Sequence, residues 1–204
     1  MTFLGNNKST VSGRYIFLVG IGSFIIAIIF TLFSEIFASK LNNLILSFVF
    51  LIIIITINIL ADLVGTAVTA ASHAPFNAKA AKRVKGAPQG LLLIKNADRV
   101  ANIANDIIGD ITTTVSGALG ISIVVQIMRV GPRFDQFWLN VLLTALISVL
   151  IVTGKAAGKK VSLSHPDEII FFVGTVLAKI ESVTGYNFFQ KQKVPKNKQK
   201  VGKQ

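Results

Sequence analysis

The chain has 204 residues, of which 52% are hydrophobic, and its mean hydropathy of +0.66 excludes an ordinary soluble domain. The absence of cysteine excludes a disulfide framework, a thiolate metal site and a cysteine nucleophile. The formal net charge of +12 is compatible with nucleic-acid binding. However, the basic C-terminal tail has no aromatic interleaving and no recognisable binding motif, so we expect no nucleic acid as a partner. Together with the hydropathy, this predicts an integral membrane protein.

Four stretches of the chain are candidates for transmembrane helices. Residues 15–33 and 41–61 contain no charged residue, and each is long enough to cross a hydrocarbon core of about 30 Å at ~1.5 Å per residue. The third stretch, residues 100–128, is interrupted by polar residues, and the fourth, residues 137–152, is short. The sequence therefore predicts an all-α, polytopic membrane protein with about four transmembrane helices.

The 21 basic residues are distributed unevenly between the connections. Two precede the first stretch, six lie between the second and the third, ten follow the fourth, and three lie in the other two connections. Because basic residues favour the cytoplasmic side, this distribution predicts a multi-pass protein of the plasma membrane with both termini in the cytoplasm. We expect its basic segments to attract anionic lipids of the bilayer, at about 1 kcal/mol per Lys.

Short amphipathic helices are expected on the cytoplasmic side. In residues 73–99, Ala- and Lys-rich segments on each side of residues 86–88 predict two short interfacial helices. After the fourth stretch, Ser164 is a candidate cap for a helix with a proline and two acids in its first turn. Apolar residues then recur at helical spacing as far as Ile180, which predicts an amphipathic surface helix.

Two of the predicted transmembrane helices carry a polar face. At about 100° per residue, one face of the second helix, with Ser47 on the same line, contains Asn58, Asp62, Gly65, Thr69 and Ser72. The third helix has a similar stripe with Asp110 at its edge, made by Asn102, Asn105, Asp106, Gly109, Thr113, Ser116, Gly117 and Gly120. Each of the two helices therefore has one face of small and polar residues.

The carboxylates on these faces have similar expected depths. Asp62 precedes His73 by eleven residues, and Asp110 follows Arg99 by eleven residues, so each should lie about 16 Å from the cytoplasmic edge, near the midplane. A buried aspartate costs roughly 2.5 to 3.5 kcal/mol on insertion scales. Because no Lys or Arg is expected within the membrane, a cation, a proton or water must compensate Asp62, Asp106 and Asp110.

The residues alone support two interpretations of the polar faces. In the first, the faces form a cation site, because hard divalent ions take carboxylate, amide, hydroxyl and backbone carbonyl oxygens as ligands. In the second, the small residues allow close helix contact, and Asp and Asn side chains stabilise that contact by hydrogen bonds. We favour the cation site, and we expect no enzymatic activity, because no catalytic arrangement of Ser, His and Asp is found outside the membrane.

Two segments of the chain follow motifs of one known family. Residues 58–72 fit the frame N-x-F-F-S-x-x-E-x-A-L-T-x-x-S, with Asp62 in place of its first Ser and Gly65 in place of its Glu. Residues 154–159 lie where a G-E-x-x-P-K motif would precede an amphipathic helix, with Lys155 in place of the Glu and Gly158 in place of the Pro. These motifs resemble those of the CNNM/CorC family of magnesium transport proteins, whose membrane domain is known as DUF21. The paired CBS domains that usually follow that domain are not in this sequence.

The resemblance implies a function, a site and an assembly. It implies a divergent family member that binds or moves a divalent cation, Mg²⁺ first of all, in a cavity between the second and third helices of a homodimer. Coupling to Na⁺ or to protons is compatible with this function. Asp62 and Asp110 would be the metal ligands, and Lys155 would set the charge at the cytoplasmic mouth. The other residues expected to face the ion or line its path are Asn58, Gly65, Thr69, Asn102, Asn105 and Asp106.

The resemblance also divides the chain. Residues 41–185 would form the DUF21-like transmembrane domain with its juxtamembrane helices, preceded by an extra transmembrane helix at residues 14–40. Residues 1–13 and the basic tail at residues 186–204 are expected to be disordered. The alternative function is a non-transporting membrane interaction or accessory protein descended from the family, in which the two family glutamates are lost and the polar faces serve helix packing.

Overall fold

The structure, a computed structural model, describes residues 13–40, 43–131 and 135–185. Most of the two segments predicted to be disordered, residues 1–12 and 186–204, lies outside this part. Every element of the described residues is a helix, which confirms the predicted all-α fold class. The elements are α1 (Gly13–Lys40), α2 (Leu44–Ala70), α3 (His73–Ala81), α4 (Ala87–Lys95), α5 (Ala97–Ala101), the π-helix η1 (Asn102–Ile108), α6 (Gly109–Val130), α7 (Gln136–Ser164) and α8 (Pro166–Thr184).

Three helices of the described residues are long and apolar enough to cross a membrane. They are α2, α7, and the continuous helix Ala97–Arg129, which contains α5, η1 and most of α6. The helix α1 has 28 residues, but its apolar part within the described residues, Phe17–Leu32, is shorter than the other three. The extra N-terminal crossing predicted at residues 14–40 therefore stays a prediction.

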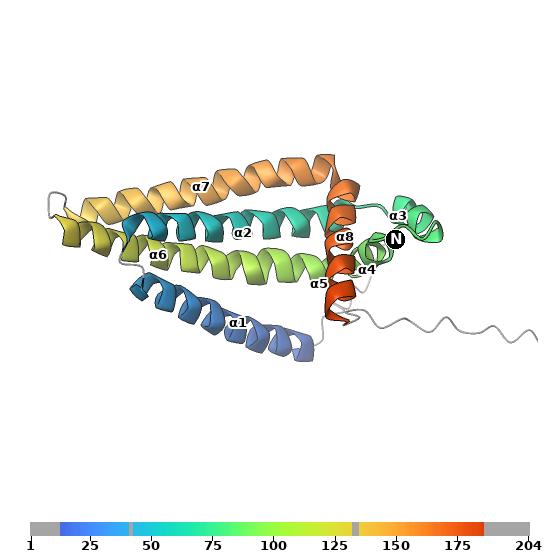
Figure 1. Cartoon of the computed structure of the whole chain (residues 1–204), viewed down its shortest axis with the longest axis horizontal. Coiled ribbons are helices and arrows are strands. Elements are labelled where there is room, and N and C mark those ends of the chain that lie inside the picture. Colours follow the sequence, from blue (N-terminus) through green and yellow to red (C-terminus); the bar gives the residue numbers. More distant parts are fainter. Residues whose placement is uncertain (1–12, 41–42, 132–134, 186–204) are drawn as a thin grey trace, which may run out of the picture.

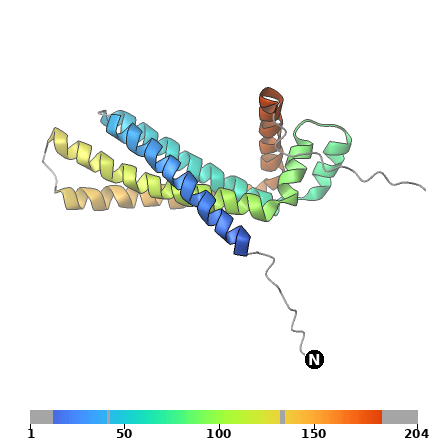
Figure 2. The same cartoon turned by 90° about the horizontal axis from the view of Figure 1, so that it is seen from below.

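The helix α2 lies at the centre of the bundle, between α6 and α7 (Figure 1). Beyond α6 lies α1, and α6 is its main contact (Figure 2). The apolar core of the bundle is formed by Leu51, Ile54, Ile55, Ile107, Ile111, Val115, Leu119, Ile123, Ile147 and Ile151. The helix α2 packs against both η1 and α6. Because residues of α2 and of the η1–α6 helix share this apolar core, their polar faces are brought together.

The helix α7 is longer than the crossing predicted at residues 137–152, because it continues to Ser164. Two glycines one turn apart let it pack closely on α2. A Cβ built on Gly154 would overlap the side chain of Ile59, and one built on Gly158 would lie 3.6 Å from Ile59 Cγ2. Residues 154–159, which carry the second family-like motif, therefore lie against α2.

The helix cap predicted at Ser164 is wrong. Ser164 is the last residue of α7, and its Oγ donates a hydrogen bond back to the α7 backbone. The chain turns at His165, and α8 begins at Pro166. An acid in the first turn of α8, Asp167, accepts a hydrogen bond of 2.8 Å from the backbone amide of Ser72. This bond connects α8 to the segment that follows α2.

The helices α3, α4 and α8 form a layer at one end of the bundle, and α8 runs across that end (Figure 1). The presence of α3 and α4 confirms the two short helices predicted around residues 86–88. Phe76 and Ile170 are buried between these helices. Glycines bring α8 close to α4, since a Cβ on Gly174 would overlap the backbone of Gly86 and would lie 2.8 Å from Gly90 N.

We expect Gly174→Ala to weaken the packing of α8 on α4, because the new methyl group meets backbone atoms, which cannot rotate away as a side chain can. Overpacking of this kind costs about 1 to 3 kcal/mol. Thermal unfolding of the full chain in detergent micelles should therefore give a lower Tm than for the wild type. Gly117→Ala is the control, because no atom lies within 4 Å of its Cβ position. An equal loss of Tm in both variants would contradict the prediction.

Candidate cation site

Asn58 on α2 is fully buried and bonds to α6. Its Nδ2 lies 2.7 Å from the Gly109 carbonyl oxygen, 2.8 Å from Thr112 Oγ1 and 2.7 Å from Thr113 Oγ1. The two threonine hydroxyls donate in turn to backbone carbonyls of their own helix, which leaves their oxygens free to accept from Asn58. This contact holds the polar face of α2 against the start of α6.

Asp62 lies one turn beyond Asn58 on the same face of α2. It is 4% exposed, and its Oδ2 has no hydrogen-bond partner among the described residues. Gly65 continues this face, and a Cβ built on it would overlap the side chain of Asn105 on η1. The space that a side chain at position 65 would occupy is therefore filled by Asn105. The predicted polar face of α2 is confirmed from Asn58 to Gly65.

Four buried oxygens on α2 and η1 have no hydrogen-bond partner in the described part of the chain: Asn58 Oδ1, Asp62 Oδ2, Asn102 Oδ1 and Asn105 Oδ1. We call these four residues the polar seam. Buried acceptors normally have a donor, and one without a donor costs about 1 to 3 kcal/mol. All four atoms are acceptors, so a cation, a bound proton or water would compensate them.

Asp110 does not share this environment. It is exposed, and it lines a groove of about 440 Å³ between α1 and the η1–α6 helix, together with Asn102, Asp106 and Ser23. Asp106, which is also exposed, accepts a hydrogen bond of 2.6 Å from Asn102 Nδ2. Within the described residues, no group of three or more His, Cys, Asp or Glu is placed to hold a metal ion. Asp62 is not among the residues that line this groove, so the structure brings Asp110 together with Asp106 and not with Asp62.

The order of residues along the third helix accounts for this separation. Asn105 and Asp106 are neighbours, as are Gly109 and Asp110, so at about 100° per residue the two members of each pair point in different directions. Residues 102–108 form a π-helix, with hydrogen bonds over five residues. Asn105 and Gly109 face α2, whereas Asp106 and Asp110 face the groove beside α1. Single turns of π-helix occur frequently at functional sites.

Two other predicted site residues lie elsewhere. Thr69 is exposed in the last turn of α2, and its Oγ1 donates to the Thr66 carbonyl, so it does not join the polar seam. Lys155 lies on the extended part of α7, is half-buried, and brings its Nζ to 3.5 Å from the Cβ position of Gly109. Lys155, predicted at the cytoplasmic mouth of the site, therefore lies close to the start of α6, and its role there stays a prediction.

Two polar contacts were not predicted. Thr112 lies outside the predicted stripe, but it is fully buried and accepts from Asn58. Ser47 exchanges hydrogen bonds with Gln126 at the other end of α2 and α6, at 3.0 and 3.2 Å. The residue type was a signal in both cases, since a polar side chain within a transmembrane helix usually has a partner on a neighbouring helix. Which residue is the partner depends on the packing of the two helices.

No family model matches the chain, and no curated protein or solved structure matches it. The resemblance to the CNNM/CorC family therefore stays a prediction that rests on residues 58–72 and 154–159.

We expect Asp62→Asn to stabilise the bundle when no metal cation is present. The substitution removes a buried charge, keeps the shape of the side chain and adds a donor beside unpaired acceptors, which should yield about 1 to 3 kcal/mol. Unfolding in detergent with choline as the buffer cation should therefore show a higher Tm for Asp62→Asn than for the wild type. Asn58→Leu, which removes the hydrogen bonds to α6, should lower the Tm. A lower Tm for Asp62→Asn would contradict the prediction.

Proposed function

We propose that the protein is an integral membrane protein that binds a cation at the polar seam and moves it across the bilayer. The observation that carries this proposal is the group of four buried acceptor oxygens without donors. Helix packing alone would leave these oxygens uncompensated, at a cost of about 1 to 3 kcal/mol each. A cation bound by oxygen ligands removes that cost.

The charge of the polar seam favours a singly charged cation over Mg²⁺. Asp62 is the one carboxylate of the seam, and its other oxygens belong to neutral amides. Na⁺ bound there leaves the seam neutral, as does a proton carried by Asp62 itself. Mg²⁺, the ion implied by the family resemblance, would leave a net positive charge in a medium of low dielectric.

The groove between α1 and α6 offers a path to the polar seam. Asp106 and Asp110 give the groove a negative charge that attracts cations. Asn102 belongs to both places, because its Nδ2 bonds to Asp106 while its Oδ1 is one of the four unpartnered oxygens. We propose that an ion passes from the groove to Asp62 by way of Asn102. In this scheme Asp106 and Asp110 attract the ion, and Asp62 binds it.

The location and assembly are proposed from the sequence. The distribution of basic residues supports cytoplasmic termini in a plasma membrane, with α1 as a fourth crossing. It also supports anionic lipids as partners of the cytoplasmic segments. The homodimer is proposed from the family resemblance alone.

A non-transporting role is the alternative, and the contact of Asn58 favours it. The two N–H groups of Asn58 have three acceptor oxygens of a neighbouring helix within reach, so this side chain is expected to hold two helices together in lipid, where such bonds contribute about 0.6 to 2 kcal/mol. In that case the polar seam would serve packing only, and Asp62 would bind no cation.

Ion flux into proteoliposomes that contain the full chain tests the proposal. We expect the wild type to carry Na⁺ down its gradient, and we expect Asp62→Asn to lower the rate by at least about tenfold, because the site loses its one charged ligand. Asp110→Asn should slow the flux less, since Asp110 lies in the groove. The flux of Na⁺, Mg²⁺ and protons is followed with ion-selective dyes inside the vesicles.

The control for this experiment is Asp98→Asn, which removes an exposed carboxylate from α5 in the same continuous helix. It should transport as the wild type does. A wild type that moves none of the three ions, or an Asp62→Asn variant as fast as the wild type, would overturn the proposal in favour of the packing role. Faster flux of Mg²⁺ than of Na⁺ would overturn the charge argument.

A further inference from the structure

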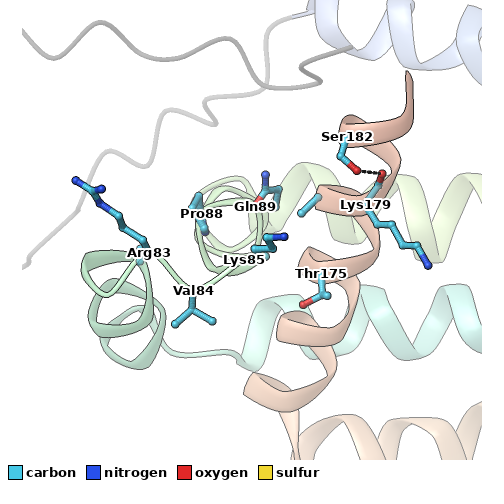
Figure 3. A pocket seen from close by; sticks show the side chains of 11 residues that line it. Arg83, Val84, Lys85, Pro88, Gln89, Thr175, Lys179 and Ser182 are labelled. Atoms are coloured by element: carbon cyan, nitrogen blue, oxygen red, sulfur yellow. Dashed lines mark hydrogen bonds between the residues drawn. The ribbon is translucent and has the colours of Figure 1, made fainter. Parts of the chain in front are cut away.

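A cavity of about 610 Å³ lies between the α3–α4 connection and α8, away from the polar seam (Figure 3). We call it the juxtamembrane pocket. Three of its lining residues are basic, namely Arg83, Lys85 and Lys179, and none is acidic. Apolar atoms of Val84 and Pro88 also line it. The pocket therefore combines positive charge with an apolar wall.

The basic side chains surround the pocket rather than fill it. Figure 3 shows the amine of Lys85 directed toward α8, whereas Arg83 and Lys179 extend outward on opposite sides. All three residues are exposed. The nearby acid Glu181 is engaged, because its Oε2 accepts a hydrogen bond of 2.7 Å from Gln89 Nε2. The charge around the pocket thus favours an anionic ligand.

The polar atoms inside the pocket are acceptors. Gln89 Oε1 is buried and has no hydrogen-bond partner within the described residues. The hydroxyls of Thr175 and Ser182 donate to carbonyls of their own helix, at 2.9 and 2.7 Å, so their oxygens remain as acceptors. A phosphate offers no donor to these atoms, but hydroxyl groups do. The complementary ligand therefore carries hydroxyl groups as well as negative charge. An ammonium group would be repelled by Lys85.

The backbone of Arg83 is unfavourable for an arginine. Its φ is 57°, in the left-handed region that glycine normally occupies at the end of a helix. The surrounding hydrogen bonds have the pattern of a helix C-terminal motif, since Arg83 N–H bonds to the Ala80 carbonyl and Val84 N–H bonds to the Lys79 carbonyl. Strain of this kind occurs at functional positions, which suggests a function for the guanidinium group beside the pocket.

The outer face of α8 indicates where the pocket lies relative to lipid. Gly174 faces α4, and the exposed apolar residues on the other side of α8 are Phe172, Val176, Ile180 and Val183. An amphipathic helix with such a face lies in the interface between water and hydrocarbon. A pocket between this helix and α4 would therefore lie at the depth of the lipid headgroups.

We propose that the juxtamembrane pocket binds a phosphate ester that carries a polyol, supplied by the headgroup of an anionic phospholipid. Lys85 binds the phosphate, Arg83 adds positive charge beside the pocket, the polyol hydroxyls donate to Gln89 Oε1 and Thr175 Oγ1, and Val84 contacts the glycerol carbons. This site is separate from the polar seam and does not depend on ion transport. A protein without transport activity would still bind the lipid.

Native mass spectrometry of the full chain, released from micelles with defined lipids, tests the site. We expect phosphatidylglycerol to bind at least about tenfold more tightly than phosphatidylcholine. It should also bind more tightly than phosphatidic acid, which has the phosphate but no polyol headgroup. Equal retention of phosphatidylcholine would overturn the proposal. Soluble glycerol phosphate should bind weakly, and binding as tight as that of the lipid would overturn the membrane as the source of the ligand.

Charge variants separate the pocket from general attraction to a basic surface. Lys85→Gln should weaken the binding of phosphatidylglycerol by about tenfold. Lys82→Gln removes an exposed charge from the same segment, but Lys82 does not line the pocket, so its effect should be clearly smaller. Equal losses in the two variants would overturn a defined site. Gln89→Leu leaves the charge unchanged and should abolish the preference for phosphatidylglycerol over phosphatidic acid.

Arg83→Gly separates binding from stability. Glycine relieves the left-handed backbone conformation, so the Tm should rise, while the loss of the guanidinium group should weaken lipid binding. Variants with lower Tm and weaker binding together would indicate a structural role only. Unchanged lipid binding in Arg83→Gly would overturn the part of the proposal that concerns Arg83.

Discussion

Asn58 joins the two helices on which the polar seam depends. Its amide bonds to the Gly109 carbonyl and to two threonine hydroxyls of α6, and a lipid environment offers the amide no alternative partner. This contact fixes the rotation of α2 about its own axis. Because Asp62 lies one turn further on the same face, it cannot turn toward lipid unless the Asn58 contact breaks. The burial of Asp62 is thus a consequence of how Asn58 is held.

The third helix keeps most of its negative charge away from that contact. Asn105 in η1 lies against Gly65, whereas Asp106 and Asp110 line the groove beside α1. A seam that contained all three carboxylates would need a divalent ion or several protons. With Asp62 alone, one positive charge is enough. The separation therefore bears directly on the charge of the ion in the proposed function.

The layer formed by α3, α4 and α8 is linked to the bundle through a few short contacts. Ser72, just after α2, bonds to Asp167 in the first turn of α8. Further along α8, Gly174 allows the backbone to meet Gly86, which lies at the edge of the juxtamembrane pocket. A ligand in the pocket would contact the same helix that is bonded to the end of α2. The pocket and the polar seam are therefore joined by continuous packing, although their chemistry is separate.

The sequence by itself determined the fold class and one side of the polar seam. Long apolar runs predict helices that are long enough to cross a membrane, and Asn58, Asp62 and Gly65 share a face because helical periodicity is a local property of one element. Local periodicity also indicated α3, α4 and α8. The tertiary structure decided which residues meet. The side of the third helix that meets α2 and the approach of Lys155 to Gly109 depend on close helix contacts. The exposure of Thr69 depends on them as well. No periodicity within a single helix carries that information, because it arises only when a second helix packs against the first.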